Sequence, residues 1–239
     1  MKKEKVSKYQ NMVLRVLADK VDDFYLAGGT ALSLFYFQHR ISVDLDFFTH
    51  NFSIKRIKEI ISYLKNDLKR EIKLVGQALK KDKAQMQVYS IYFAKKDILK
   101  IGFVEDFFKL IKQPKVVDGI KILSLEDIFI RKLYALVGTI PIYDMVGERK
   151  IAGGRVEAKD FYDIYYLSNT FMSLSKFADE YTDATTKEGL INWFRSYDRM
   201  KMMDGILTLD IGKKIDCKNM ERHFSREIDK IVEGYIEGI

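Results

Sequence analysis

Residues 24–48 have the sequence F-Y-L-A-G-G-T-A-L-S-L-F-Y-F-Q-H-R-I-S-V-D-L-D-F-F, and this stretch decides the fold. A strand is expected at 23–26, where Phe24, Tyr25 and Leu26 form an apolar run, and the pair Gly28 and Gly29 that follows predicts a tight turn. A helix is expected from about Thr30 to Gln38, with Thr30 as its N-cap, because a hydroxyl can accept a free backbone N–H there. A second strand is expected at 43–48. The stretch therefore predicts a strand, a glycine turn, a helix and a second strand.

Asp44 and Asp46 are separated by one residue on the second of these strands. Residues i and i+2 of a strand point to the same face, so both carboxylates project to one side while Leu45 and Phe47 enter the core. Two adjacent carboxylates repel each other unless a cation lies between them, and oxygen ligands select Mg²⁺ or Mn²⁺. The pair therefore predicts a metal site, and the alternative of a solvated face on an edge strand stays open.

Gly28 and Gly29 lie directly before the expected helix. Glycines let backbone amides approach an anion closely, and the positive end of a helix dipole favours a phosphate. The alternative is a tight turn with no ligand. No G-x-x-x-x-G-K or G-x-G-x-x-G motif is present. A phosphate site followed by a carboxylate pair on the adjacent strand is the arrangement that holds a nucleoside triphosphate by its phosphates and its metal ions.

Outward from this stretch, the hydrophobic period changes along the chain. Apolar residues recur at helical spacing over 3–19 and 53–68, and they alternate with polar residues over 71–79, 85–94 and 98–104, with a shorter extended piece at 116–123. After Ser124 we expect helices at 124–137, 156–168, 173–181, 186–197 and 219–236, and a glycine-containing loop at 138–154. The pattern predicts an α+β fold with a mixed sheet of four to six strands in residues 1–124, followed by a helical domain in residues 125–239.

Composition limits the class of protein. The chain of 239 residues has a net charge of +7, which permits a polyanionic partner such as RNA but does not require one. One cysteine and three histidines give no zinc-ligand spacing. No apolar run approaches the roughly 20 residues that span a bilayer, and no apolar signal segment follows Met1. We therefore expect a cytoplasmic protein without a membrane segment.

Six short motifs together resemble the nucleotidyltransferases of the polymerase beta superfamily, and within it the AbiEii/AbiGii-type toxins of toxin–antitoxin and phage-defence systems. They are G-G-T-A-L at 28–32, H-R-I-S-V-D-L-D-F at 39–47, K-I-G-F-V-E-D-F at 100–107, S-L-E-D-I at 124–128, R-K-L-Y-A-L at 131–136 and K-D-F-Y-D-I-Y-Y-L at 159–167. The resemblance covers roughly the first 170 residues. It implies a nucleotidyltransferase-like sheet with helices, and a helical C-terminal domain that closes the active-site cleft.

The resemblance also implies roles for single residues. Lys132 and Asp160 match a catalytic pair of the helical half, in which Lys132 stabilises phosphates and Asp160 positions or deprotonates the acceptor hydroxyl; Asp163 is a further conspicuous acid. The implied nucleotide-binding residues are Gly28, Gly29, Thr30, Arg40 and Ser42, and the implied catalytic metal ligands, for Mg²⁺ or Mn²⁺, are Asp44 and Asp46.

One position departs from the pattern of the superfamily. Its members usually carry a third carboxylate on a following strand, and here the expected position is occupied by Gly102, which can neither bind metal nor accept a proton. Glu105 and Asp106 follow closely, but Glu105 is on the other face unless the strand bulges. Either Asp160 supplies the missing group, or the protein binds nucleotide with weak or no transfer.

The implied function is metal-dependent transfer of NMP from an NTP to an acceptor hydroxyl, most simply at the 3′ end of a tRNA, by a toxin with a cognate antitoxin. Two alternatives stay open. One is a nucleotide-binding protein without transferase activity, and the other is a nucleotidyltransferase that modifies a protein hydroxyl. No short motif encodes which NTP is used.

Overall fold

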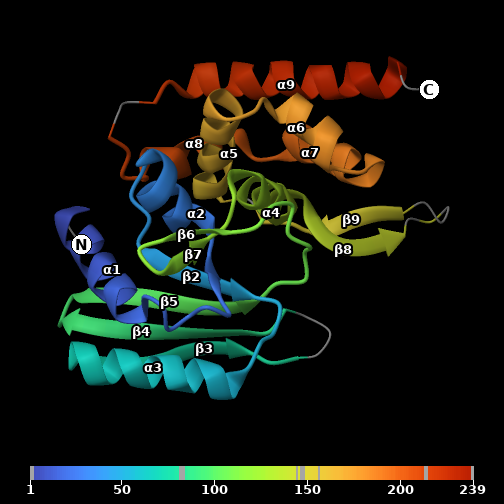
Figure 1. The fold of residues 1–239 in the computed structure, drawn as a ribbon. Coiled ribbons are helices and arrows are strands. Elements are labelled where there is room, and N and C mark those ends of the chain that lie inside the picture. The colour runs from blue at the N-terminus through green and yellow to red at the C-terminus, as the bar shows by residue number, and fades with distance from the viewer. Residues whose placement is uncertain are drawn as a thin grey trace. The chain divides into compact units, whose positions relative to one another are not determined.

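The computed structural model describes residues 3–80, 84–143, 145, 149–155, 157–212 and 215–237. The chain divides into two units, Met1–Ser124 and Leu125–Ile239 (Figure 1). The first unit contains a mixed sheet and the second is mainly helical, which confirms the expected α+β fold class. Within the described residues, no helix is both long and apolar enough to cross a lipid bilayer.

The first unit is built on a seven-stranded sheet in the order β3-β4-β5-β2-β1-β7-β6. The pairs β2–β5 and β1–β7 are parallel, and the other neighbours are antiparallel. The sheet exceeds the expected four to six strands because the piece at 116–123 folds back at Asp118 and Gly119, which both have positive φ angles. The strands are β1 (Tyr25–Leu26), β2 (Asp44–Thr49), β3 (Glu71–Ala78), β4 (Met86–Ala94), β5 (Asp97–Glu105), β6 (Lys115–Val117) and β7 (Ile120–Ile122).

Helices α1 (Lys3–Leu17) and α3 (Ile54–Leu68) cover one face of this sheet, and α3 runs alongside β3 and β4 in Figure 1. The Tyr9 ring of α1 stacks on Phe93 of β4, with ring centroids 4.1 Å apart. Apolar residues at alternate strand positions form the core on this side, and each of them is fully buried: Leu45, Phe47, Leu99, Ile101 and Phe103. The residues between them therefore face the other side of the sheet.

In the second unit, an aromatic cluster of Phe161, Trp193, Tyr197 and Phe224 joins three of the helices. The helices are α4 (Leu125–Val137), α5 (Ala158–Thr170), α6 (Leu174–Tyr181), α7 (Ala184–Ser196), α8 (Arg199–Leu207) and α9 (Cys217–Glu237). The expected loop at 138–154 is wrong in part, because β8 (Gly138–Tyr143) and β9 (Arg149–Gly153) form an antiparallel pair. Pro141 within β8 and glycines at both ends conceal this strand pattern in the sequence.

Candidate active site

Asp44 and Asp46 lie on β2 as the alternation predicts. Both are half-buried on one face, and Leu45 and Phe47 between and after them are fully buried on the other. Strand β5 runs parallel to β2, and its Lys100 and Gly102 lie opposite Asp44 and Asp46. Because opposite residues of neighbouring strands share a face, the two acids, Lys100 and Gly102 form one surface.

Gly102 is the cross-strand partner of Asp46, at the position expected for a third acid. A Cβ atom on Gly102 would lie 2.9 Å from Oδ1 of Asp46, which is closer than real Cβ contacts. The carboxylate of Asp46 therefore occupies the space that a side chain at residue 102 would need. The site on this surface contains two acids, and the glycine permits the observed position of one of them.

The two acids that follow Gly102 are engaged elsewhere. Glu105 lies opposite Thr49 in a β2–β5 register without a bulge, and its Oε2 accepts a hydrogen bond of 3.0 Å from the backbone N of Gln85. Asp106 is buried and accepts a hydrogen bond from the Tyr25 hydroxyl. Neither carboxylate replaces the missing acid next to Asp46.

The glycine pair forms the first turn of α2 (Gly28–Ala31), which continues into the π-helix η1 (Leu32–Phe37). Gly28 has φ of +67°, a conformation that favours glycine. A Cβ atom on Gly28 would lie 3.7 Å from Oδ2 of Asp46, so the turn lies directly beside this carboxylate. The backbone turn and the metal-binding candidate therefore meet at one place.

Arg40 packs against Gly29. A Cβ atom on Gly29 would lie 2.1 Å from Nη2 of Arg40 and 3.3 Å from Oγ of Ser42. Arg40 is 6% exposed, and its Nη1 donates to the backbone O of Ile41. A guanidinium beside a helix N-terminus adds positive charge where an anion would bind. The absence of a side chain at residue 29 allows this close approach.

Thr30 does not cap the helix as expected, because the helix begins before it and Ala27 is the N-cap. The Thr30 hydroxyl is buried, donates to the backbone O of Asp44 and lies 2.8 Å from Oγ of Ser42. Nε2 of Gln10 donates to the backbone O of Ser42 at 2.7 Å. These bonds tie the glycine turn to the start of β2, so Thr30 fixes the position of the turn relative to the acids.

Among the described residues, no group of three or more His, Cys, Asp and Glu side chains is arranged to hold a metal ion. The donor set still fits Mg²⁺ or Mn²⁺ delivered with a triphosphate, because Mg²⁺ keeps several waters and binds through one or two carboxylates together with substrate phosphates. Asp44 and Asp46 would be those carboxylates. The two acids beside the Gly28 turn therefore suit a metal ion that a bound triphosphate also ligates, rather than a metal ion held by protein groups alone.

Lys132 and Asp160 lie in the second unit, where they form a buried cluster of charges. Nζ of Lys132 contacts Oδ1 of Asp160 and lies 2.8 Å from Oδ2 of Asp163, and Nε of Arg155 lies 2.8 Å from Oδ2 of Asp160. Both aspartates are fully buried. Each oxygen of Asp160 therefore has a cationic partner.

The environment of Asp160 determines its protonation. Burial raises the pKa of this carboxyl, but the charges of Lys132 and Arg155 and their hydrogen bonds outweigh burial and hold the pKa below its ordinary value. Asp160 is thus ionised at neutral pH. Sequence reasoning missed Arg155, because an arginine in a loop five residues before Asp160 has no periodic signal.

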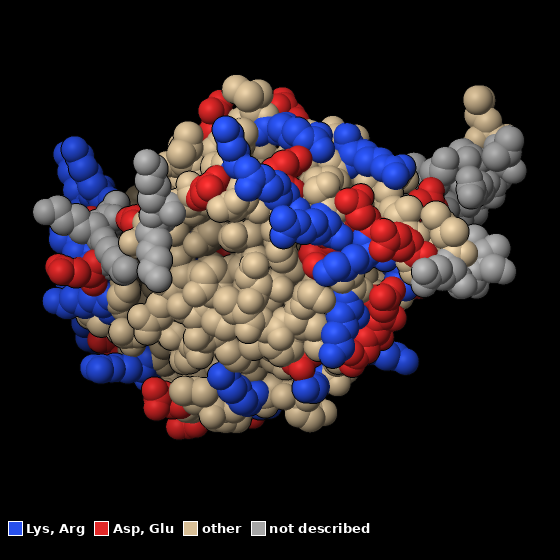
Figure 2. Space-filling view, turned by 90° about the horizontal axis from the view of Figure 1, so that it is seen from above, with Lys and Arg blue, Asp and Glu red and all other residues tan. Residues whose placement is uncertain are grey.

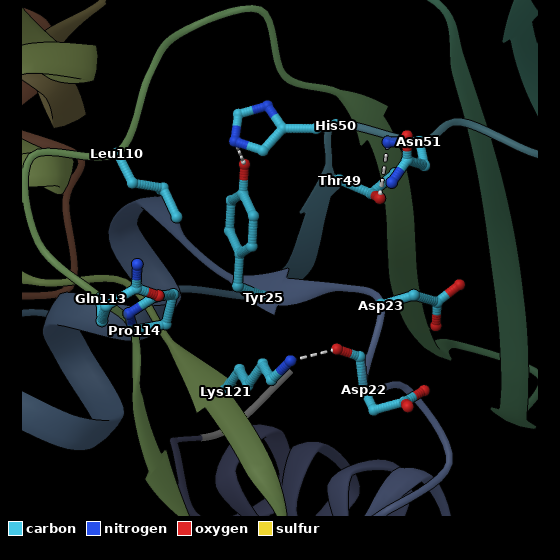
Figure 3. A pocket seen from close by; sticks show the side chains of 10 residues that line it. All are labelled: Asp22, Asp23, Tyr25, Thr49, His50, Asn51, Leu110, Gln113, Pro114 and Lys121. Atoms are coloured by element: carbon cyan, nitrogen blue, oxygen red, sulfur yellow. Dashed lines mark hydrogen bonds between the residues drawn. The ribbon is translucent and has the colours of Figure 1, made fainter.

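A separate pocket of about 210 Å³ lies at the opposite end of β1 and β2 from the glycine turn (Figure 3). Tyr25, His50 and Lys121 are among the residues that line it. The Tyr25 hydroxyl donates to Asp106, Nδ1 of His50 lies 2.8 Å from the backbone O of Asp106, and Nζ of Lys121 donates to the backbone O of Asp22. The polar side chains of Tyr25, His50 and Lys121 thus form hydrogen bonds with other groups of the protein.

Comparisons with known proteins identify the family and the fold. Residues 13–236 match the family model described as nucleotidyl transferase AbiEii toxin, type IV toxin–antitoxin system. The crystal structure of JHP933 from Helicobacter pylori has a TM-score of 0.56 and 19% identity, with 98% of this chain and 94% of that chain covered. The crystal structure of a putative nucleotidyltransferase from H. pylori has the same TM-score and identity, with 97% and 96% covered.

Both solved structures therefore share the fold of this chain. Among curated proteins, none matches the sequence. The family match extends over nearly the whole chain, from the first helix to the end of the last. The chain therefore belongs to the AbiEii family of nucleotidyl transferase toxins.

Proposed function

We propose that this toxin nucleotidyltransferase transfers NMP from an NTP to a hydroxyl of RNA, most simply at the 3′ end of a tRNA, with Mg²⁺ or Mn²⁺. The observation that carries the proposal is the position of the Asp46 carboxylate between the Gly28 turn and Gly102. A phosphate cradle and a metal ligand that meet at one point suit the α-phosphate of a bound triphosphate.

In the proposed reaction the acceptor oxygen forms a bond to the α-phosphorus, and the bond from that phosphorus to the bridging oxygen breaks. Pyrophosphate leaves with the electron pair, and the hydroxyl proton passes to solvent. The metal ion, when bound, neutralises charge on the α-phosphate and the leaving group. Gly28 and Gly29 would offer backbone amides to the triphosphate, Arg40 and Ser42 line the same turn, and Asp44 and Asp46 would hold the metal ion.

Lys132 and Asp160 are proposed to act in the same reaction, with Lys132 on the phosphates. The contacts of Asp160 favour a positioning role, because both of its oxygens have cationic partners and its pKa is lowered. A weakly basic carboxylate whose oxygens are occupied holds a lysine well and accepts a proton poorly. To test this role, the rate of transfer is measured for Asp160→Asn and for Lys132→Met. Thermal unfolding of each variant checks that the protein stays folded.

A second candidate function is nucleotide binding without transfer, and the observation that favours it is the glycine at position 102. A third is transfer to a protein hydroxyl, which the net positive charge of the chain does not favour. The family name further suggests a cognate antitoxin. We propose such a partner, tested by rescue of growth when the neighbouring gene is co-expressed.

One experiment separates the three functions. The purified protein is incubated with each labelled NTP, Mg²⁺, total tRNA and a protein extract, and label is followed on RNA and on protein. Label on RNA is the expected result, and label on protein alone favours the third candidate. Nucleotide binding with no label on either fraction favours the second.

A further inference from the structure

Helix α3 carries a row of lysines along its length. Positions 55, 58, 62, 65 and 69 follow one another at spacings of three or four residues, so they lie on one side of the helix. All five side chains are exposed, and four of them are lysines with Ser62 in the middle. A rise of ~1.5 Å per residue makes the row about 21 Å long. Its lysines, here called the lysine stripe, are Lys55, Lys58, Lys65 and Lys69.

The lysine stripe has no anionic partner. Among the described residues, none of its side chains takes part in an ion pair or a side-chain hydrogen bond. The two acids of α3 lie outside the row and have cations of their own. Oδ2 of Asp67 lies 3.2 Å from Nζ of Lys20, and Oε2 of Glu59 lies 3.5 Å from Nη1 of Arg56. Four positive charges therefore remain uncompensated on one side of the helix.

The other sides of α3 are occupied by the protein. Its apolar side is buried in the core of the first unit. A second side lies against the segment that follows α1, where Nη2 of Arg56 donates to the backbone O of Lys20 at 2.7 Å and Nε of Arg56 lies 3.1 Å from Oδ2 of Asp23. The lysine stripe lies on the remaining side, which faces solvent.

The positive charge of the chain is concentrated in the unit that contains α3. Residues 1–124 hold 24 of the 41 lysines and arginines and 14 of the 34 acidic residues, a net charge of +10. Residues 125–239 hold 17 and 20, a net charge of −3. Figure 2 looks onto the side on which α9 lies, where basic and acidic side chains are interspersed. A polyanion is thus attracted to the first unit rather than to the second.

We propose that the lysine stripe binds the phosphate backbone of a double-stranded region of the acceptor RNA. This inference rests on the proposed function. Each ammonium group is a point charge that contacts a phosphate without reading a base. A straight row of cations on a rigid helix suits the regular row of phosphates along a duplex. With a rise of ~3.4 Å per nucleotide in each strand, the row spans about six nucleotides.

The stripe and the candidate active site lie on different sides of the sheet. Helix α3 covers the face that holds Leu45 and Phe47, whereas Asp44 and Asp46 lie on the other face. The stripe therefore holds a part of the RNA other than the end that reacts. It raises the affinity for RNA without contacting the reacting atoms.

Two other anionic partners suit the stripe less well. A helix that binds a lipid surface inserts an apolar face, and the apolar face of α3 is already buried in the core. A stable interface with an acidic protein has an apolar centre, but the residue at the middle of this row is Ser62. A row of lysines without apolar residues is suited to phosphates.

Binding is tested with the full chain, a fluorescent RNA duplex and no NTP. Each single Lys→Ala substitution in the stripe should reduce the slope of log affinity against log salt by about 0.9, the value for one phosphate contact with a duplex. Replacing all four lysines by alanine should weaken binding at least about tenfold at physiological salt. Because alanine is the best helix former, α3 should remain intact, which thermal unfolding checks.

Two controls accompany the fourfold alanine variant. Replacing the four stripe lysines by arginine keeps the charges and should keep the affinity within about twofold of the parent protein. The second control removes the same amount of charge elsewhere, and it should keep the parent's salt slope. It replaces by alanine four exposed lysines that have no ion pair among the described residues, namely Lys109, Lys176, Lys201 and Lys218.

The proposal is overturned if the parent protein does not bind the duplex, or if the fourfold alanine variant keeps the parent's salt slope. An equal loss of slope in the control at positions 109, 176, 201 and 218 also overturns it, because net charge alone would then explain binding. Binding of phosphatidylserine vesicles or polyglutamate through the stripe, in the absence of RNA binding, assigns the surface to another partner and rejects the proposal.

The docking surface and the proposed function fail separately. If the duplex binds through the stripe but the protein labels no RNA, the docking surface stands and RNA as the acceptor is rejected. If the fourfold alanine variant labels RNA with the KM and kcat of the parent, the proposed function stands and the docking surface is rejected. The expected result is a higher KM for RNA with an unchanged kcat.

Discussion

Oδ1 of Asp46 lies 2.9 Å from the point where a Cβ atom on Gly102 would stand. The two residues are cross-strand partners in the parallel pair β2–β5, so they face each other on one side of the sheet. Gly102 therefore does more than replace a third carboxylate. Because it has no side chain, it leaves the space that the Asp46 carboxylate occupies. Any side chain at residue 102 must displace Asp46 or the neighbouring backbone.

Gly102→Ala and Gly102→Asp should therefore both reduce transfer, by about 100-fold if the Asp46 carboxylate moves by about 1 Å. Steady-state labelling of RNA measures the effect. Gly234→Ala is the matched control, because a Cβ atom there meets nothing within 4 Å. A gain of activity in Gly102→Asp would instead mean that the natural site lacks an acid it needs.

Asp44→Asn and Asp46→Asn should each reduce transfer by at least about 100-fold, since the metal-bound phosphates lose a charged ligand. Removing one of two neighbouring like charges should leave the thermal unfolding midpoint unchanged or raise it. Asp204→Asn, a change at an exposed acid of α8, provides the control. Full transfer activity in Asp46→Asn would exclude the proposed metal site.

Gly29→Ala should weaken nucleotide binding while the protein stays folded. The added methyl group would meet Nη2 of Arg40 at 2.1 Å, and this end of a flexible side chain can move away. The displaced guanidinium no longer lies beside the turn that would hold the phosphates. Titration with a fluorescent NTP analogue should show an affinity loss of about tenfold, as expected for one charge-assisted contact of about 1.4 kcal/mol.

Arg40→Lys is the companion to this variant, because lysine keeps the charge but loses the planar fork. It should lose affinity to a similar extent. If Gly29→Ala binds the analogue normally while Arg40→Lys does not, the methyl group is accommodated without displacement of Arg40.

Because of Asp160, the free energy of unfolding should depend on pH in the acid range. Its pKa is lower in the folded chain than its ordinary value of 3.8, because Lys132 and Arg155 outweigh burial. Such a carboxyl contributes stability that is fully present above the unfolded pKa and is lost as pH falls through the folded pKa. The free energy of unfolding of Asp160→Asn should therefore differ most from that of the parent at neutral pH.

Urea titrations between neutral pH and about pH 3 measure this difference, which should shrink below about pH 4. Lys132→Met leaves two buried carboxylates without their lysine and should cost about 3–5 kcal/mol of stability. A difference between Asp160→Asn and the parent that stays constant down to the lowest pH would contradict the proposed ion pairs.

Alternation of polar and apolar residues was enough to predict the strand that carries the acids. Polar and apolar residues alternate strictly from Asp44 to Phe47. On a half-buried strand alternate residues point to opposite faces, so both carboxylates had to share one face. Gly102 was also placed on the face opposite the core by parity alone, because Leu99, Ile101 and Phe103 had to enter the core. The family resemblance rested on the same short motifs, and the match over residues 13–236 confirmed it.

Local signals were less reliable where a contact distant in the sequence competes with them. Thr30 has the chemistry of an N-cap, but its hydroxyl instead donates to the backbone of Asp44, fourteen residues away in the chain. The loop expected at 138–154 contains two strands, because pairing between β8 and β9 compensates for Pro141 and the glycines. Propensity is a weak preference that such tertiary contacts override.

Which side chains lie next to each other depends on the tertiary fold. The register of β2 against β5 places Asp46 opposite Gly102, and the registers of β3, β4 and β5 place Gly76 and Gly102 in one row. Burial beside both Lys132 and Arg155 fixes the charge of Asp160. A sequence pattern specifies which face a side chain occupies, whereas its neighbours depend on strand pairing and on packing between segments that are distant in the chain.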